Sequence, residues 1–316
     1  GIGVGLLGIG TFTQVNGISS AVNNFFDSNN AWTVSLFGRT YSWTVVISCL
    51  ILTFCVALVL IGGIQRISKV AQVIVPFMAA TYFLAGILII LFNITDVPAA
   101  ILTIVQSAFG LKAAAGGALG AMVVAMQKGI ARGIFSNEAG LGSAPIAAAA
   151  ARTNEPVRQG LASMTATFID TIIICSITGI AIVLTGAYDM GLEGVAVTTK
   201  AFQLGLPFPD GVASFILMLC LVFFAFTTIL GWDYYSERCL EYLTNGKKKC
   251  IKAYRWIYIL CVFIGPYMTV SAVWTIADIF NGLMAIPNLI ALVALNGVVA
   301  KETKDYLDRI KKKEID

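Results

Sequence analysis

The chain has 316 residues, of which 58% are hydrophobic and 12% are charged, and its mean hydropathy is +0.86. Repeated apolar runs of about twenty residues, without period-two alternation, indicate membrane-spanning helices and exclude a soluble globular domain. The net charge of +4 is small and the basic residues gather in short loops, which does not favour a nucleic-acid partner. We therefore expect an all-α integral membrane protein in a lipid bilayer.

The sequence contains no histidine, which excludes Ser-His and Cys-His nucleophilic catalysis and His-ligated metal sites. None of the seven cysteines forms a CxxC pair, and most of them lie inside apolar runs, as small buried hydrophobic residues do. We expect no enzymatic activity, no cofactor and no metal site apart from a coupling ion.

Eight segments are long and apolar enough to predict membrane crossings. They cover residues 1–24, 42–63, 68–93, 128–151, 159–186, 210–232, 254–274 and 277–299. The alanine- and glycine-rich region 94–127 predicts short helices in an external or re-entrant connection, which could add a further crossing. The charged tail 300–316 predicts a helix at the membrane surface.

Most Lys and Arg residues fall in segments that alternating crossings place on one side of the membrane. These segments are 65–69, 152–158, 247–255 and 301–313. The positive-inside rule makes this side cytoplasmic, so that both ends of the chain are cytoplasmic. The loops expected outside are 25–41, 94–127 and 187–209.

The first predicted crossing contains four polar residues within GIGTFTQVNG, namely Thr11, Thr13, Gln14 and Asn16. Four polar side chains within about one and a half helical turns favour a pocket wall. Hydrogen bonding between helices is the alternative.

The fourth predicted crossing contains the polar stretch GIFSNEAGLGSAP at 133–145. Gly140, Gly142 and Pro145 predict a break in the helix, where freed backbone groups must bind something other than lipid. An ionisable residue such as Glu138 is energetically costly inside a membrane crossing, so its presence there indicates a specific role. It could meet a cation or an amino group, brace the broken helix by accepting backbone N–H bonds, or lie closer to the interface.

Ser136 and Asn137 beside it supply hard oxygen donors, which Na⁺ prefers. A helix N-terminus after the break, around 142–144, would favour a carboxylate. Together these features predict a pocket for a small zwitterion beside a cation.

The sixth predicted crossing contains a hydroxyl pair, Thr227 and Thr228, in an otherwise apolar run. Threonine in a membrane helix often bonds the carbonyl one turn back. The alternative is a cation site made by the two hydroxyls and a carbonyl such as that of Phe224.

Three further polar residues lie in the predicted crossings. Asp170 could be an ion ligand, an ion-pair partner or a structural acceptor. Asp278 and Asn281, in the last crossing, indicate a wet face or a gate.

Several sequence motifs resemble those of the alanine/glycine:cation symporter family, also called sodium:alanine symporters. The motifs are FSNEAGLGSAPIAAAAA followed by PVRQG, GIGTFTQVN, ILIGGIQRISKVAQVIVPFMA, FAFTTILGWDYYSE and DIFNGLMAIPNLIAL. They occur in the family's order along essentially the whole chain.

This resemblance implies a LeuT-type architecture of two inverted five-helix repeats, each opening with a helix that is broken at the substrate site. Residues 1–93 would then supply the last three helices of the first repeat. Residues 128–299 would form the second repeat. The family pattern also has an earlier glycine-rich broken helix, so we expect this chain to be the C-terminal part of a longer protein.

The resemblance also implies roles for single residues. The broken segment would bind substrate and one Na⁺ through Phe135, Ser136, Asn137, Glu138, Gly140 and Gly142. Gln14 would line the opposite pocket wall. Thr227 and Thr228 would contribute to a sodium site.

The function implied is Na⁺-coupled uptake of alanine or glycine by alternating access across a prokaryotic cell membrane. H⁺ coupling through Glu138 or Asp170 is an alternative, and so is an inactive fragment that lacks the first broken helix. The residues leave open whether a D-isomer or a larger amide is preferred. They also leave open the Na⁺ stoichiometry and the oligomeric state.

Overall fold

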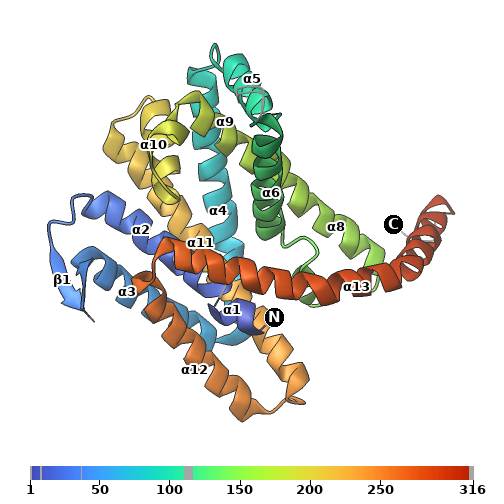
Figure 1. The fold of residues 1–316 in the computed structure, drawn as a ribbon. Helices are drawn as coiled ribbons and strands as arrows, with labels where there is room; N and C mark the ends of the chain where they lie inside the picture. The colour runs from blue at the N-terminus through green and yellow to red at the C-terminus, as the bar shows by residue number, and fades with distance from the viewer. Residues whose placement is uncertain (1, 8, 37, 110–116, 313–316) are drawn as a thin grey trace.

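Long helices make up most of the computed structural model, which describes residues 2–7, 9–36, 38–109 and 117–312 (Figure 1). Among these residues, six segments are long and apolar enough to cross a membrane. They are α3 (Trp43–Ile61), α4 (Gly63–Phe92), α6 (Ala118–Asn137), the segment Pro156–Leu184, α11 (Asp210–Leu243) and α13 (Val270–Lys311).

Shorter elements connect and extend these six segments. Pro156–Leu184 consists of α8 (Pro156–Phe168), the π-helix η2 (Ile169–Cys175) and α9 (Ser176–Leu184). The remaining elements are α1 (Ile2–Leu7), the π-helix η1 (Ile9–Thr13), α2 (Gln14–Phe26), β1 (Thr33–Leu36), β2 (Arg39–Ser42), α5 (Val97–Ala108), α7 (Ala144–Ala148), the 3₁₀ turn η3 (Ala187–Asp189), α10 (Val195–Gly205), α12 (Lys248–Ile264) and the 3₁₀ turn η4 (Gly265–Tyr267).

Two of the eight predicted crossings are not single helices of spanning length. The first, 1–24, is divided by η1, a widened turn in the glycine-rich run between α1 and α2. The seventh, 254–274, contains the 17-residue helix α12, which ends where Gly265 and Pro266 form η4. The other six predicted crossings overlap the six long segments.

The fourth crossing begins ten residues earlier than predicted, at Ala118 rather than residue 128. The preceding region contains α5, and residues 110–116 of the predicted connection lie outside the described residues. Small side chains concealed this helix from the hydropathy pattern, because alanine and glycine contribute little apolar surface.

The fold is all-helical as expected, and the described residues add one short hairpin in the predicted outer loop 25–41. There β1 and β2 pair antiparallel, with Thr33 opposite Ser42. Asp27 fixes the base of this hairpin by accepting hydrogen bonds from Ser42 Oγ at 2.6 Å and from the backbone N–H of Ala31 at 2.7 Å. These bonds, that of Ser42 foremost, hold the pKa of Asp27 below its usual range.

Helix α11 lies at the centre of the fold and packs against α2, α4 and α10 (Figure 1). Its apolar residues point in all directions, which is typical of a helix surrounded by protein. Leu217 lies in a core shared with α4, α9 and α10, whereas Ile229 and Leu230 lie in a second core shared with α2, α3 and α12.

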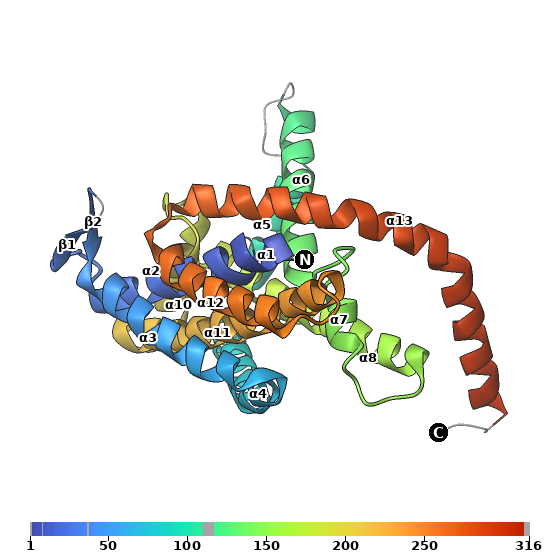
Figure 2. The ribbon, with the colours of Figure 1, turned by 90° about the horizontal axis from the view of Figure 1, so that it is seen from below.

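The outer faces of the peripheral helices carry large exposed apolar side chains, such as Phe54 (64% exposed) and Val293 (79% exposed). Such surfaces suit contact with lipid tails. The last helix, α13, continues without interruption into the charged tail, and Figure 2 shows it running past α1 before its C-terminal part turns away.

Candidate functional site

The predicted break in the fourth crossing is present. Helix α6 ends at Asn137, and α7 begins at Ala144. Between them, Glu138, Gly140 and Gly142 have left-handed backbone conformations, with φ of 51°, 74° and 77°. Glycine adopts this conformation without steric cost, so these two glycines let the chain turn between the helices.

Glu138 bridges the break through its carboxylate. Ser143, which is fully buried, donates a 2.6 Å hydrogen bond to Glu138 Oε2. Of the three alternatives left open by the sequence, this contact fits a bracing role. The donor, however, is a side-chain hydroxyl rather than the expected backbone N–H.

The two residues before Glu138 bind to the π-helix η2. Ser136 Oγ donates to Asp170 Oδ2 at 2.6 Å, and Asn137 Nδ2 donates to Thr171 Oγ1 at 2.5 Å. A π-helical turn redirects side chains and is frequent at functional sites. Asp170 thus acts as an acceptor for Ser136, and the structure brings three predicted residues together.

One polar atom of this group has no partner. The side-chain oxygen of Asn137 is buried and accepts no hydrogen bond from any described residue. Because a buried polar atom without a partner is rare, Asn137 Oδ1 marks a place where a donor such as an ammonium group or a cation would be stabilised.

An aromatic and ionic cluster lies one turn earlier on α6. Arg132 Nη2 donates to both carboxylate oxygens of Asp278 at 2.9 and 2.8 Å, and its guanidinium lies 4.3 Å from the ring centroid of Trp274. Phe135 packs against the same indole at 5.0 Å. Asp278 therefore forms an ion pair, while Arg132 and Trp274 are residues that the sequence analysis missed.

The loop of the break also packs against α11. Leu141 lies in a buried cluster with Trp232 and Met284. Trp232 Nε1 is buried without a partner among the described residues, and the same holds for the side-chain oxygen of Asn281. The sequence does not indicate that the indole N–H of Trp232 is buried without a partner, because this depends on tertiary packing.

The hydroxyl pair of α11 bonds to its own helix. Thr227 donates to the carbonyl oxygens of Phe223 and Phe224, both at 3.0 Å, and Thr228 donates to that of Phe224 at 2.8 Å. This is the back-bonding alternative. It also gathers two hydroxyl oxygens around the Phe224 carbonyl, and Trp232 lies one turn beyond Thr228.

The described hydrogen bonds and ion pairs do not join every predicted site residue. Ser136 faces Asp170, and no such bond links it to Thr227 or Thr228. Gln14 is half-buried at the start of α2, and no described hydrogen bond joins it to residues 133–145. Asn16 Nδ2 donates to the Met268 carbonyl at 3.0 Å, which fits the alternative of bonding between helices.

Comparison with known proteins places the chain in a family. The family model described as the sodium:alanine symporter family matches residues 2–316. The chain belongs to the sodium:alanine symporter family. With its six apolar segments, this membership makes it a multi-pass membrane protein of a transporter family rather than an enzyme family.

Three relatives illustrate the range of this symporter family. The chain is 51% identical, over 98% of its length, to an uncharacterised transporter of Haemophilus influenzae, of which the match covers 64%. It is 42% identical, over 97% of its length, to the sodium/alanine symporter AgcS of Methanococcus maripaludis, of which the match covers 63%. It is 40% identical, over 89% of its length, to the probable sodium/glutamine symporter GlnT of Bacillus subtilis, covering 58% of it. The chain thus spans less than two thirds of these relatives.

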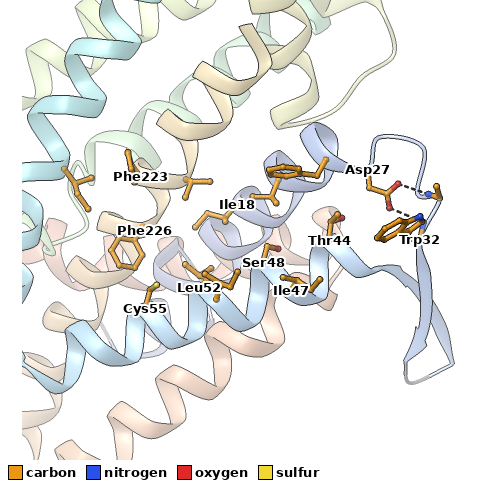
Figure 3. A pocket seen from close by; sticks show the side chains of 16 residues that line it. Ile18, Asp27, Trp32, Thr44, Ile47, Ser48, Leu52, Cys55, Phe223 and Phe226 are labelled. Carbon is orange, nitrogen blue, oxygen red and sulfur yellow. Dashed lines mark hydrogen bonds between the residues drawn. The ribbon is translucent and has the colours of Figure 1, made fainter. Parts of the chain in front are cut away.

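A large cavity in this member of the symporter family lies away from the helix break. It measures about 880 Å³ and lies between α2, α3 and α11, where Ile18, Leu52 and Phe226 line it (Figure 3). Its lining is almost wholly apolar, and the Asp27 carboxylate at its edge is already bonded within the hairpin base. A zwitterion needs convergent polar groups, so this cavity is not a candidate for the amino-acid site.

Proposed function

We propose that the chain forms part of a secondary transporter that couples Na⁺ entry to the uptake of a small neutral amino acid, alanine or glycine, by alternating access. The observation that carries the proposal is the polar break at 136–143 inside a membrane helix of a sodium:alanine symporter family member. The protein would lie in a prokaryotic cell membrane with both ends of this chain in the cytoplasm.

The substrate site would lie at the break. Asn137 Oδ1 and the Glu138 carboxylate would face the substrate ammonium group, and the backbone N–H groups of Gly140 and Gly142, which lie between the two helices, would face its carboxylate. Phe135 would cover the small side chain of the substrate. Gln14 would approach from the opposite wall.

The sodium site would use the oxygens of Thr227, Thr228 and the Phe224 carbonyl, with Ser136 near a second ion. Hydroxyl and carbonyl oxygens are hard ligands suited to Na⁺. Both threonine hydroxyls keep free lone pairs while they donate to carbonyls of their own helix, so they could accept an ion without unwinding α11.

The architecture would be of the LeuT type, with 1–93 in the first repeat, 94–127 as a connection, 128–299 as the second repeat and 300–316 as a cytoplasmic tail. Na⁺ would raise the population of an outward-open state that accepts substrate. Thermodynamic reciprocity then requires substrate to tighten Na⁺ binding by the same factor.

Uptake into liposomes tests this function. The protein is reconstituted, and labelled alanine uptake is compared with Na⁺, K⁺ or choline outside. We expect uptake with Na⁺ alone; equal rates with all three cations would contradict sodium coupling. Uptake driven by a pH gradient without Na⁺ would favour the H⁺-coupled alternative through Glu138 or Asp170.

A double variant tests the sodium ligands. Replacing Thr227 and Thr228 by valine keeps the shape of both side chains but removes two oxygen ligands, so the Na⁺ half-saturation should rise by about tenfold, equivalent to about 1.4 kcal/mol. Thr81→Val is the matched control, because Thr81 donates to the Phe77 carbonyl of α4 in the same back-bonding geometry. An unchanged Na⁺ half-saturation in the double variant would remove these residues from the site.

A further inference from the structure

A buried cluster of charged residues lies where α11 meets α12 and α1, apart from the helix break. Asp233 is 1% exposed and Glu237 is 6% exposed, and they stand one turn apart on α11. Neither residue belongs to the substrate or sodium ligands proposed above. Burial of two carboxylates in a membrane protein calls for compensation by positive charge or by protons.

The positive charge in the cluster balances only one of the two carboxylates. Arg255 of α12 binds both oxygens of Glu237, through Nε at 2.7 Å and Nη2 at 2.9 Å. This bidentate pair uses the geometry that suits a guanidinium and a carboxylate. Two ionised carboxylates and one guanidinium would leave the cluster with a net charge of −1.

Asp233 has one carboxylate oxygen that is buried without a partner among the described residues. Its Oδ1 is inaccessible to solvent and accepts no hydrogen bond from the described residues. The titratable groups that face it are Glu237 on its own helix and Arg255, Tyr254 and Tyr258 of α12. The described residues of α1 and η1 contain no titratable side chain.

Tight packing closes the cluster. A Cβ at Gly5 would lie 1.7 Å from Ser236 Oγ, and one at Gly10 would lie 2.4 Å from Trp232 Cβ, so α1 and η1 press directly on this part of α11. The Tyr258 hydroxyl of α12 contacts both η1 and α11, since it lies 3.0 Å from the Gly10 carbonyl oxygen and 2.8 Å from that of Ile229. Water reaches Asp233 only if these elements separate.

We propose that Asp233 is a proton-binding site: it holds a proton while α1, η1, α11 and α12 are packed together, and it exchanges that proton with water when they separate. On separation the carboxylic acid transfers its proton to a water molecule, leaving a carboxylate and a hydronium ion, and closure reverses the transfer. A neutral acid removes the net charge of −1, whereas an ionised Asp233 would be a buried charge facing a guanidinium, that of Arg255, which is already paired with Glu237. The site needs neither the substrate nor the sodium assignment to be correct.

Its position gives this proton a means to influence transport. Asp233 lies five residues after Thr228 on α11, which corresponds to about 7.5 Å along a helix. Any separation of α12 from α11 that ionises Asp233 would therefore act close to the hydroxyl pair.

Infrared difference spectroscopy of the purified full-length protein during a pH titration tests the proposal. We expect the carbonyl band of a buried protonated carboxylic acid at neutral pH, absent in Asp233→Asn. Glu237→Gln should also lose the band, because Arg255 would then be free to balance an ionised Asp233. Asp210→Asn is the matched control on α11, since Asp210 is exposed, and it should keep the band.

Thermal unfolding separates this site from a merely structural charge. Asparagine resembles a neutral carboxylic acid in shape, so Asp233→Asn should unfold at nearly the wild-type temperature. Glu237→Gln should unfold earlier, because it loses the bidentate hydrogen bonds between Glu237 and Arg255. The proposal would be overturned if the wild type lacked the acid band or if the band survived in Asp233→Asn. It would also be overturned if both variants were equally destabilised. Loss of the band on adding Na⁺ at constant pH would show that the site binds a metal cation rather than a proton.

Discussion

At the helix break, the polar side chains form hydrogen bonds in pairs, although Asn137 Oδ1 has no partner among the described residues. Ser136 bonds to Asp170, Asn137 to Thr171, and Glu138 to a residue on the far side of the break. A ligand that replaces one partner of a pair breaks one hydrogen bond, and the net contribution of such a bond to stability is only about 1 kcal/mol. A small polar substrate could therefore enter the break by exchanging bonds without unfolding either helix.

Gly142 is the residue on which the shape of the break depends most directly. Its φ is +77°, and a Cβ there would lie 2.8 Å from Asn288 Oδ1 of α13. Gly142→Ala should lower the free energy of unfolding by about 1–2 kcal/mol, because a side chain disfavours the left-handed conformation. Chemical unfolding in detergent, followed by tryptophan fluorescence, measures the change.

Gly133→Ala is the matched control for this variant. Gly133 lies inside α6, and a Cβ there would meet no atom within 4 Å. Alanine should therefore leave stability unchanged or raise it by at most about 1 kcal/mol. If Gly142→Ala is as stable as Gly133→Ala, the left-handed turn is not required by the fold.

At the scale of elements, the local features were predictable and the tertiary ones were not. The break followed from Gly140, Gly142 and Pro145, because these residues act on their own backbone. The π-helices η1 and η2 contain ordinary residues, and no local pattern predicts a widened turn in them.

The partners of the predicted site residues were equally hidden in the sequence. Asp278 was singled out, but Arg132 binds it across 146 positions of the chain. Nothing in the local sequence distinguishes Asp233, because its significance depends on Arg255 being already bound to Glu237. Side-chain types can be read along a chain, whereas charge balance is a property of the packed cluster.

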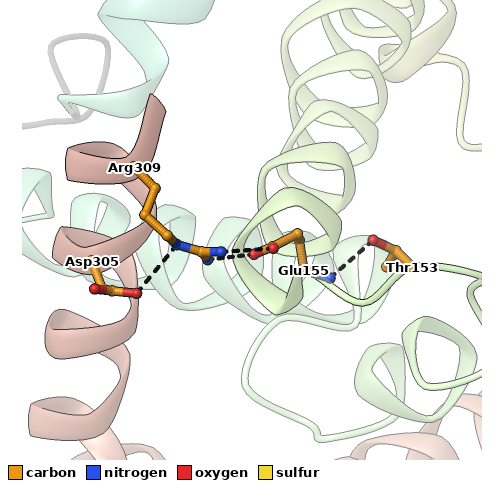
Figure 4. Close-up of polar contacts among 4 residues, drawn as sticks. All are labelled: Thr153, Glu155, Asp305 and Arg309. Carbon is orange, nitrogen blue, oxygen red and sulfur yellow. Dashed lines mark hydrogen bonds and ion pairs between the residues drawn. The ribbon is translucent and has the colours of Figure 1, made fainter. Parts of the chain in front are cut away.

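The last helix is tied to the start of α8 by an ion pair. Arg309 of α13 donates to both oxygens of Glu155, at 2.9 and 2.6 Å, and also lies 3.3 Å from Asp305 (Figure 4). The hydrogen bonds from Arg309 hold the pKa of Glu155 below its usual range.

This ion pair predicts an acid-sensitive attachment of the tail. Because the pKa of Glu155 is lower in the folded state, its contribution is fully present above the pKa of a free glutamate and is lost as the pH falls through the lowered value. Hydrogen exchange of the amides of residues 300–312 should therefore show more protection in the wild type than in Glu155→Gln at neutral pH.

The same comparison at acidic pH supplies the control, since both proteins are measured under identical intrinsic exchange rates. With Glu155 protonated, the two should exchange alike. A difference between them that persists unchanged into acid would show that the attachment does not depend on the charge of Glu155.

At the scale of the whole molecule, the distribution of charge sets the orientation. The loop 244–247 between α11 and α12, with the first turns of α12, contains the run GKKKCIKAYR, whereas the hairpin of β1 and β2 is separated from it by the length of α3 or of α12. Helix α3 has 19 residues, which span about 28 Å at the helical rise, close to the thickness of the hydrocarbon core. The hairpin and the lysine-rich run should therefore lie on opposite sides of the membrane.

Cys250 lies within that lysine-rich run and is exposed, so it can report this orientation. In a variant that keeps Cys250 as its only cysteine, a membrane-impermeant maleimide should label inside-out vesicles but not right-side-out vesicles, because translocating clustered lysines is unfavourable. Trp32→Cys in a cysteine-free background is the matched control, since Trp32 is 75% exposed beside the hairpin, and it should give the opposite pattern. Labelling of Cys250 in right-side-out vesicles would show that the orientation is opposite to the one expected. Labelling of both positions from one side would show that α3 does not cross the membrane.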